Sequence, residues 1–285
     1  MATPSYIQWF VKSSEEYKTK DGKNVEVWEF KHNDDETILK EWAWNFRQNY
    51  ISDEEISLLI EDSYYEGRKQ DFLREIVFPD EKTFYKNRVP EDNIVRIGDF
   101  AELLVADFFQ FCNEKKYWIP RTRYDLKDNR NFSTKGTDIL GFKLEDDTLK
   151  NTNDTLLTVE VKANFGKTRK KKKLQEAICD AQKDGINNKD PTRGAESLFV
   201  LQKRFFKEKK YKEAMTVKRF LNHTDNPFKL QHCASAIFTD SNFNKDVIEE
   251  IDTSEDNLNL KLIVFHGNEL MTLCQNLYER AINEA

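Results

Sequence analysis

The sequence predicts an α/β protein with a mixed central sheet flanked by helices, preceded by an N-terminal α+β accessory region. Short stretches of apolar residues alternate with segments in which apolar residues recur every three or four positions, as expected for strands interleaved with helices. The chain has 285 residues, enough to bury a core without disulfides, and its four cysteines form no Cys-x-x-Cys pair. A zinc knuckle or a disulfide scaffold is therefore not expected.

The accessory region is predicted to span residues 1–90. A β-hairpin is expected over residues 5–31, around the turn "KDGK", and the periodicity of "DDETILKEWAWNFRQNY" predicts a helix after it. Ser52 and Glu55 have the spacing of a capping box and predict the start of a second helix. Two prolines in "FPDEKTFYKNRVPEDN" place a linker near residues 79–93.

Residues 91–285 are predicted to form the main domain. It opens with the strongly apolar helix "IVRIGDFAELLVADFFQFCNEKKY", followed by strands around residues 136–144 and 155–163. The remaining segments are predicted, in order, as a helix at "KKKLQEAICDAQKDGI", a strand or short segment at "ESLFVLQ", a basic helix at "KEKKYKEAMTVKRFLNH", a strand at "HCASAIFTD", a helical turn at "NFNKDVIEEI", a strand at "LKLIVFHG" and a final helix at "ELMTLCQNLYERAINE".

Charge is unevenly distributed along the chain. The net charge is −6, yet residues 162–219 hold 18 basic and 7 acidic residues. This segment is either a solvated helix surface or a face that binds phosphate groups. Its aromatic residues Phe205, Phe206 and Tyr211 are expected in the core rather than stacked on nucleic-acid bases. Because no long apolar run or signal peptide is present, the protein is expected in the cytoplasm.

Three charged residues stand out in the two strands that follow the apolar helix. Asp138 lies in "KGTDILGF", and Glu160 and Lys162 lie two apart in "LLTVEVKA", on the same face of a strand. Two converging carboxylates repel unless a cation lies between them, and hard oxygen ligands favour Mg²⁺ or Mn²⁺. Lys162 would then orient a water or stabilise charge on a phosphodiester. The alternative is a turn-capping aspartate beside a Glu–Lys surface pair, since acid-x-Lys triplets such as "EYK" and "EFK" recur by chance.

The order R-x-G-[D/E]-x-x-E on a helix, then G-x-D, then E-x-K on strands resembles the PD-(D/E)XK superfamily of restriction-enzyme-like nucleases. More narrowly, "RIGDFAELL", "KGTDILGF", "LLTVEVKA" and "LIVFHGNELMTLCQNLYERA" resemble the HamA family, the nuclease subunit of the Hachiman antiphage system, over roughly residues 90–280. The resemblance implies a restriction-endonuclease-like core, Lys162 as the catalytic lysine, and Glu102, Asp138 and Glu160 as active-site acids that bind Mg²⁺ or Mn²⁺.

The resemblance also implies partners. DNA is expected to bind a basic run beside the second strand, formed by Lys167, Arg169, Lys170, Lys171, Lys172 and Lys173. A superfamily 2 helicase, HamB, is expected to restrain the nuclease until it meets phage-associated or damaged DNA, and the acidic N-terminal region containing "EWAWNFRQNY" is predicted to face it. Two alternatives stay open: a stand-alone restriction or repair nuclease, and a catalytically inactive binding module on the same fold.

Overall fold

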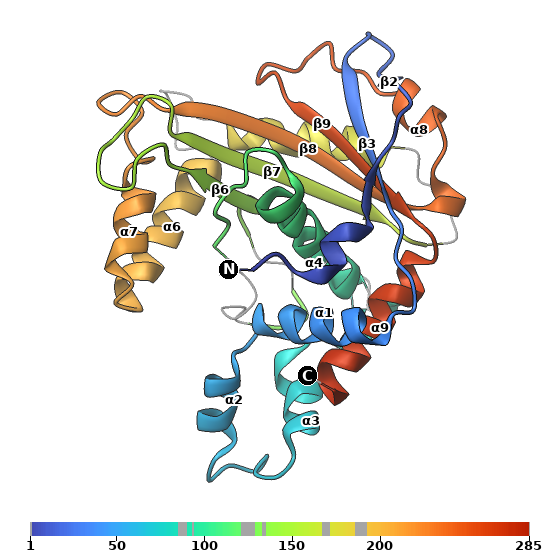
Figure 1. Cartoon of the computed structure of the whole chain (residues 1–285), viewed down its shortest axis with the longest axis vertical. Helices are drawn as coiled ribbons and strands as arrows, with labels where there is room; N and C mark the ends of the chain where they lie inside the picture. Colours follow the sequence, from blue (N-terminus) through green and yellow to red (C-terminus); the bar gives the residue numbers. More distant parts are fainter. Residues whose placement is uncertain are drawn as a thin grey trace.

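A mixed sheet forms the centre of the molecule (Figure 1). The computed structural model describes residues 2–84, 90–92, 94–120, 129–132, 135–166, 172–185 and 193–284. Within them, the strand order is β1-β3-β9-β8-β7-β6, and β2 also pairs with β3. Strands β3, β9, β8 and β7 are parallel, whereas β1 and β2 run antiparallel to β3 and β6 runs antiparallel to β7. The strands are β1 (Phe10–Lys12), β2 (Tyr17–Lys18), β3 (Asn24–Phe30), β6 (Ile139–Lys143), β7 (Thr155–Asn164), β8 (Lys229–Thr239) and β9 (Lys261–Gly267).

Helices cover both faces of this sheet. One face carries α1 (Glu36–Gln48), α4 (Ile94–Asp107) and α9 (Leu270–Asn283), and the other carries α5 (Lys173–Ala181) and α8 (Asp246–Glu249). Helices α6 (Arg193–Lys207) and α7 (Tyr211–Lys218) pack together beside β6 (Figure 1). Smaller elements are η1 (Ser5–Trp9), α2 (Asp53–Ile60), α3 (Lys69–Phe72), η2 (Leu73–Val77), β4 (Lys82–Phe84), β5 (Pro90–Asp92), η3 (Phe108–Cys112), η4 (Gln182–Asp184) and η5 (Asp240–Asn242). The predicted α/β class is confirmed.

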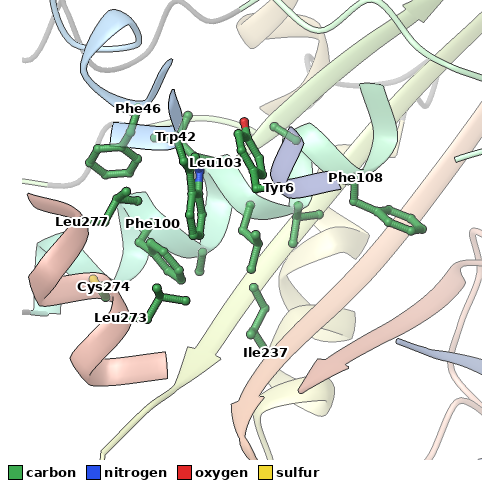
Figure 2. Packing of buried hydrophobic residues seen from close by; sticks show 14 of the residues in the cluster. Tyr6, Trp42, Phe46, Phe100, Leu103, Phe108, Ile237, Leu273, Cys274 and Leu277 are labelled. Carbon is green, nitrogen blue, oxygen red and sulfur yellow. The ribbon is translucent and has the colours of Figure 1, made fainter. Parts of the chain in front are cut away.

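The largest hydrophobic core joins residues from both ends of the chain. Figure 2 shows Trp42 and Phe46 of α1 packing with Phe100 of α4 and Leu277 of α9. Residues before and after the predicted boundary near residues 79–93 therefore share one core, and β3 shares the sheet with β9. The stretch "EWAWNFRQNY" mainly serves this core, since Trp44 is its only aromatic residue with a largely exposed side chain.

Most predicted elements are present, and one is wrong. Ser52 caps α2 with Glu55 in a capping box, as predicted. The segment "ESLFVLQ", predicted as a strand or short segment, lies inside α6. The run of β-prone residues there conceals a helical spacing, because Leu198, Leu201 and Phe205 are buried on one face while Phe199 and Val200 are exposed. No helix in the described ranges has both the length and the apolar composition needed to cross a membrane.

Candidate active site

The register of β6 and β7 brings Asp138 beside Glu160. Ile139 pairs with Val159 in this antiparallel ladder, so the preceding residue, Asp138, lies opposite Glu160. Directly opposed residues project from the same side of a sheet. A hydrogen bond fixes the arrangement, because the backbone N–H of Val161 donates to Asp138 Oδ2 at 2.9 Å. The two acids predicted from the sequence therefore lie together.

Lys162 completes the predicted group. Its Nζ lies 2.9 Å from Glu160 Oε1 and 2.8 Å from Oδ2 of Asp180, on α5. Only 2 % of Glu160 is exposed to solvent. Burial and the neighbouring charge of Asp138 raise the pKa of Glu160 to about 8, although Lys162 and Arg193 act in the opposite direction. Glu160 therefore loses its proton less readily than an ordinary glutamate, mainly because it is buried.

Three residues that the sequence reasoning missed complete the cluster: Asp180, Asp184 and Arg193. Arg193, at the start of α6, places Nη2 2.6 Å from Glu160 Oε2 and Nε 2.7 Å from Asp184 Oδ1. Burial raises the pKa of Asp184 more than Arg193 and Thr137 lower it. A signal for the two acids was present in the sequence, since residues four apart share one helix face. No local pattern pointed to Arg193, whose contacts depend on how α6 packs.

The loop before β6 is tied to α6. The backbone N–H of Thr137 donates to Ser197 Oγ at 3.0 Å, and its hydroxyl donates to Asp184 Oδ1 at 2.9 Å. Gly136 has a φ of +115°, and a Cβ there would lie 2.8 Å from Ser197 Oγ. Glycine thus permits both the backbone conformation and the close approach of α6. These contacts fix Asp138 relative to Arg193.

The remaining predicted site residues are Glu102 and the basic run after β7. Glu102 is half-buried on α4, which packs on the β7 face that carries Leu157 and Val159, whereas Glu160 and Lys162 face α5. The role of Glu102 as a metal ligand stays a prediction. Lys172 is exposed before α5, and Lys173 pairs with Glu176. The other predicted DNA contacts, Lys167, Arg169, Lys170 and Lys171, lie outside the described residues.

The donor set suits a hard divalent cation. Asp138, Glu160, Asp180 and Asp184 gather near Lys162, Arg193 and the largely exposed Lys183, and Asp184 Oδ2 is buried without a hydrogen-bond partner in the part of the chain described. No three His, Cys, Asp or Glu side chains in that part converge to hold a metal ion. Mg²⁺ needs only one or two carboxylates, completing its shell with water and substrate phosphate. Asp138 and Glu160 are the residues that would hold it.

A mixed sheet flanked by helices, with Asp138 directly before β6, Glu160 on the adjacent β7 and Lys162 two residues beyond it, defines an α/β protein with a restriction-endonuclease-like core. A HamA family model matches residues 4–281, and the chain therefore belongs to the HamA family of the Hachiman defence system. The match includes the N-terminal region for which the sequence motifs gave no resemblance. A comparison with curated proteins found no match.

Proposed function

We propose that this chain is a metal-dependent DNA endonuclease, the effector of a Hachiman system that acts in the cytoplasm. The observation that carries the proposal is the group formed by Asp138, Glu160 and Lys162, with Glu160 buried and its pKa raised to about 8. Membership of the HamA family supports the defence role. Such carboxylates are costly in a fold and are typical of functional sites.

The lysine has a defined part in this chemistry. A divalent cation, when bound by Asp138 and Glu160, supplies polarisation of the phosphodiester and acidifies water. Burial lowers the pKa of Lys162, but Glu160, Asp180 and Asp138 outweigh that effect and raise it above its usual range. Lys162 therefore stays protonated and stabilises negative charge that develops on the phosphate, rather than accepting a proton.

Cleavage of supercoiled plasmid tests this function. With Mg²⁺ or Mn²⁺, the chain is expected to nick or linearise plasmid DNA, either alone or together with the proposed partner helicase, and EDTA should prevent cleavage. Asp138→Ala, Glu160→Ala and Lys162→Ala should each reduce the rate at least about 100-fold. Equal cleavage by all four proteins would contradict the assignment of the site. Metal and DNA binding without cleavage under any condition would favour an inactive binding module.

A basic and aromatic surface extends away from this site along α6 and α7. The outward face of α6 carries Phe199, Val200, Lys203, Phe206 and Lys207, at the spacing of one helix stripe. Phe205 is buried, as the sequence predicted, but Phe206 and Tyr211 are exposed with ring centroids 6.2 Å apart, so that expectation is wrong for them. Lysines hold phosphates and exposed rings stack on bases. We propose this face as a path for a DNA strand.

Charge reversal on this path should weaken DNA binding. Lys207→Glu combined with Lys212→Glu, an exposed lysine on α7, is expected to reduce affinity for single-stranded DNA about tenfold. The magnitude of the slope of log affinity against log salt should fall by about 1.4. Phe206→Ala should weaken binding without changing that slope, because stacking is not ionic. Fluorescence anisotropy at several salt concentrations measures both quantities. Lys40→Glu, on exposed α1 surface, is the control, and an equal loss in that variant would exclude a specific path.

The restraining helicase is proposed to contact the tip formed by α2 and the residues after it. Leu58, Leu59 and Tyr64 are exposed there by 73 %, 58 % and 74 %, beside the acids that open α2. Large apolar side chains that cluster on a surface are typical of protein interfaces. Figure 1 shows α2 and α3 projecting away from the sheet, where a partner has access. The expected partner surface is apolar with a basic rim.

Two leucine substitutions test this contact. Leu58→Asp combined with Leu59→Asp should reduce co-purification of the helicase at least about tenfold. The proposed complex buries both leucine side chains, and aspartate at these positions would place charge in the apolar contact. Leu149→Asp is the matched control, since Leu149 is equally exposed, by 68 %, in the loop between β6 and β7. Loss of the helicase in the control but not in the double variant would place the interface elsewhere.

A further inference from the structure

Arg193 holds the same carboxylate that a metal ion would need. Its Nη2 lies 2.6 Å from Glu160 Oε2, while the other oxygen of Glu160 lies 2.9 Å from Lys162 Nζ. Each oxygen of this buried carboxylate thus has a protein cation within hydrogen-bond distance. A divalent cation at Glu160 would bring positive charge against the guanidinium, at short range and away from bulk water.

The guanidinium is also placed so that it can leave Glu160 without becoming unpaired. Its Nε contacts Asp184 Oδ1 at 2.7 Å, and its Nη2 also donates to the backbone oxygen of Asp180 at 2.9 Å. The Arg193 side chain is 23 % exposed, compared with 2 % for the Glu160 side chain. Rotation about the contact with Asp184 would draw Nη2 away from Glu160 while Nε keeps its partner.

We propose that Arg193 is a built-in counter-cation that occupies Glu160 in the resting protein, so that binding of a divalent metal requires its displacement. This inference rests on the proposed metal-dependent activity and assigns a positioning residue to that site. It makes the resting chain a weak metal binder, and anything that draws Arg193 away, such as a DNA phosphate, strengthens metal binding. Arginine suits this exchange because its planar fork binds carboxylate and phosphate alike.

Metal affinity without DNA tests the proposal. Mn²⁺ binding to the full chain, followed by electron paramagnetic resonance of the free ion, should be at least about tenfold tighter for Arg193→Gln than for the wild type. Without metal, Arg193→Gln should melt at a lower temperature, because Glu160 and Asp184 lose their partner, and Mn²⁺ should raise its melting temperature more than that of the wild type.

Three further variants separate an effect on metal binding at Glu160 from a general loss of structure. Arg219→Gln removes a comparable buried ion pair, since Arg219 Nη2 lies 2.6 Å from Asp154 Oδ2 and its side chain is 10 % exposed, and should leave Mn²⁺ affinity unchanged. Arg193→Lys, a single ammonium that cannot hold both Glu160 and Asp184 in one fork, should bind Mn²⁺ with intermediate affinity and provides the measurement if the glutamine variant does not fold. Adding Glu160→Gln to Arg193→Gln should remove the gain.

Several results would overturn the inference. These are Mn²⁺ affinity that is unchanged or weaker in the Arg193 variants, a gain that persists without Glu160, or no Mn²⁺ binding in any variant. Because the readout needs no DNA cleavage, it is independent of the plasmid assay. Equal Mn²⁺ binding at Glu160 in all Arg193 variants, with plasmid cleavage intact, overturns the role of Arg193 and leaves the nuclease proposal standing.

Discussion

Replacing Glu160 with glutamine is expected to abolish DNA cleavage and, in the absence of metal, to leave the fold at least as stable as the wild type. Glutamine keeps the shape of the side chain but carries no charge, so it cannot hold a divalent cation together with Asp138. Cleavage should fall at least about 100-fold. The free energy of unfolding should not fall with it, because Lys162 keeps Asp180 and Arg193 keeps Asp184 as partners.

The difference in stability between Glu160→Gln and the wild type should change with pH in a definite direction. Burial and Asp138 raise the pKa of Glu160 from 4.5 to about 8, so the folded protein disfavours its ionised form. The contribution of protonated Glu160 to the stability of the wild type is fully present below pH 4.5 and is lost as the pH rises through 8. In EDTA, the melting temperature of Glu160→Gln relative to the wild type should therefore increase between pH 5 and pH 9. A relative melting temperature that decreases over this range would contradict the argument.

Asp256→Asn is a control of opposite sign. Burial alone would raise the pKa of Asp256, but Lys23, Gln182 and two backbone N–H groups outweigh it and lower the pKa. The contribution of Asp256 to stability is therefore present at pH values above its unfolded pKa of 3.8 and is lost as the pH falls through its lower pKa in the folded protein. Asp256→Asn should melt below the wild type at pH 7, and this deficit should shrink in acid.

Strand patterning made part of the site predictable. Alternation in "LLTVEVKA" places Glu160 and Lys162 on one face, and the next antiparallel neighbour brings Asp138 beside them. These are local consequences of the sequence. Arg193 joins the group only because α6 packs against η4, a tertiary contact that no period in "PTRGAESLF" encodes. The catalytic roles of Asp138, Glu160 and Lys162 stay predictions, whereas their proximity is observed.

Dependence on tertiary packing also explains why the strand predicted inside α6 was wrong and why the sequence did not show which face of the sheet α4 covers. Leu198 to Leu201 is a continuous apolar run, and such a short run does not distinguish a strand from a helix. Only Phe205, one turn further, shows the helical stripe against β6 and α7. For Glu102, periodicity predicted the helix correctly, but which face of the sheet the helix covers depends on packing with α1 and α9.

Gly194→Ala is expected to destabilise the protein and disrupt the active site, although alanine favours helices. A Cβ at Gly194 would lie 2.7 Å from the backbone oxygen of Asp184, which cannot yield as a flexible side chain would. The first turn of α6 must then move away from η4, which draws Ser197 from Thr137 and so releases the loop that holds Asp138. We expect a loss of about 1–3 kcal/mol in the free energy of unfolding and a large loss of plasmid cleavage.

Gly98→Ala separates this packing effect from helix propensity. Gly98 lies inside α4, and a Cβ there would have no atom within 4 Å. Alanine is favoured over glycine in a helix interior by about 1 kcal/mol, so this variant should unfold at a higher urea concentration while Gly194→Ala unfolds at a lower one. The same substitution then has opposite signs in two helices, because only α6 approaches another backbone closely. Similar gains in both variants would mean that α6 does not depend on this contact.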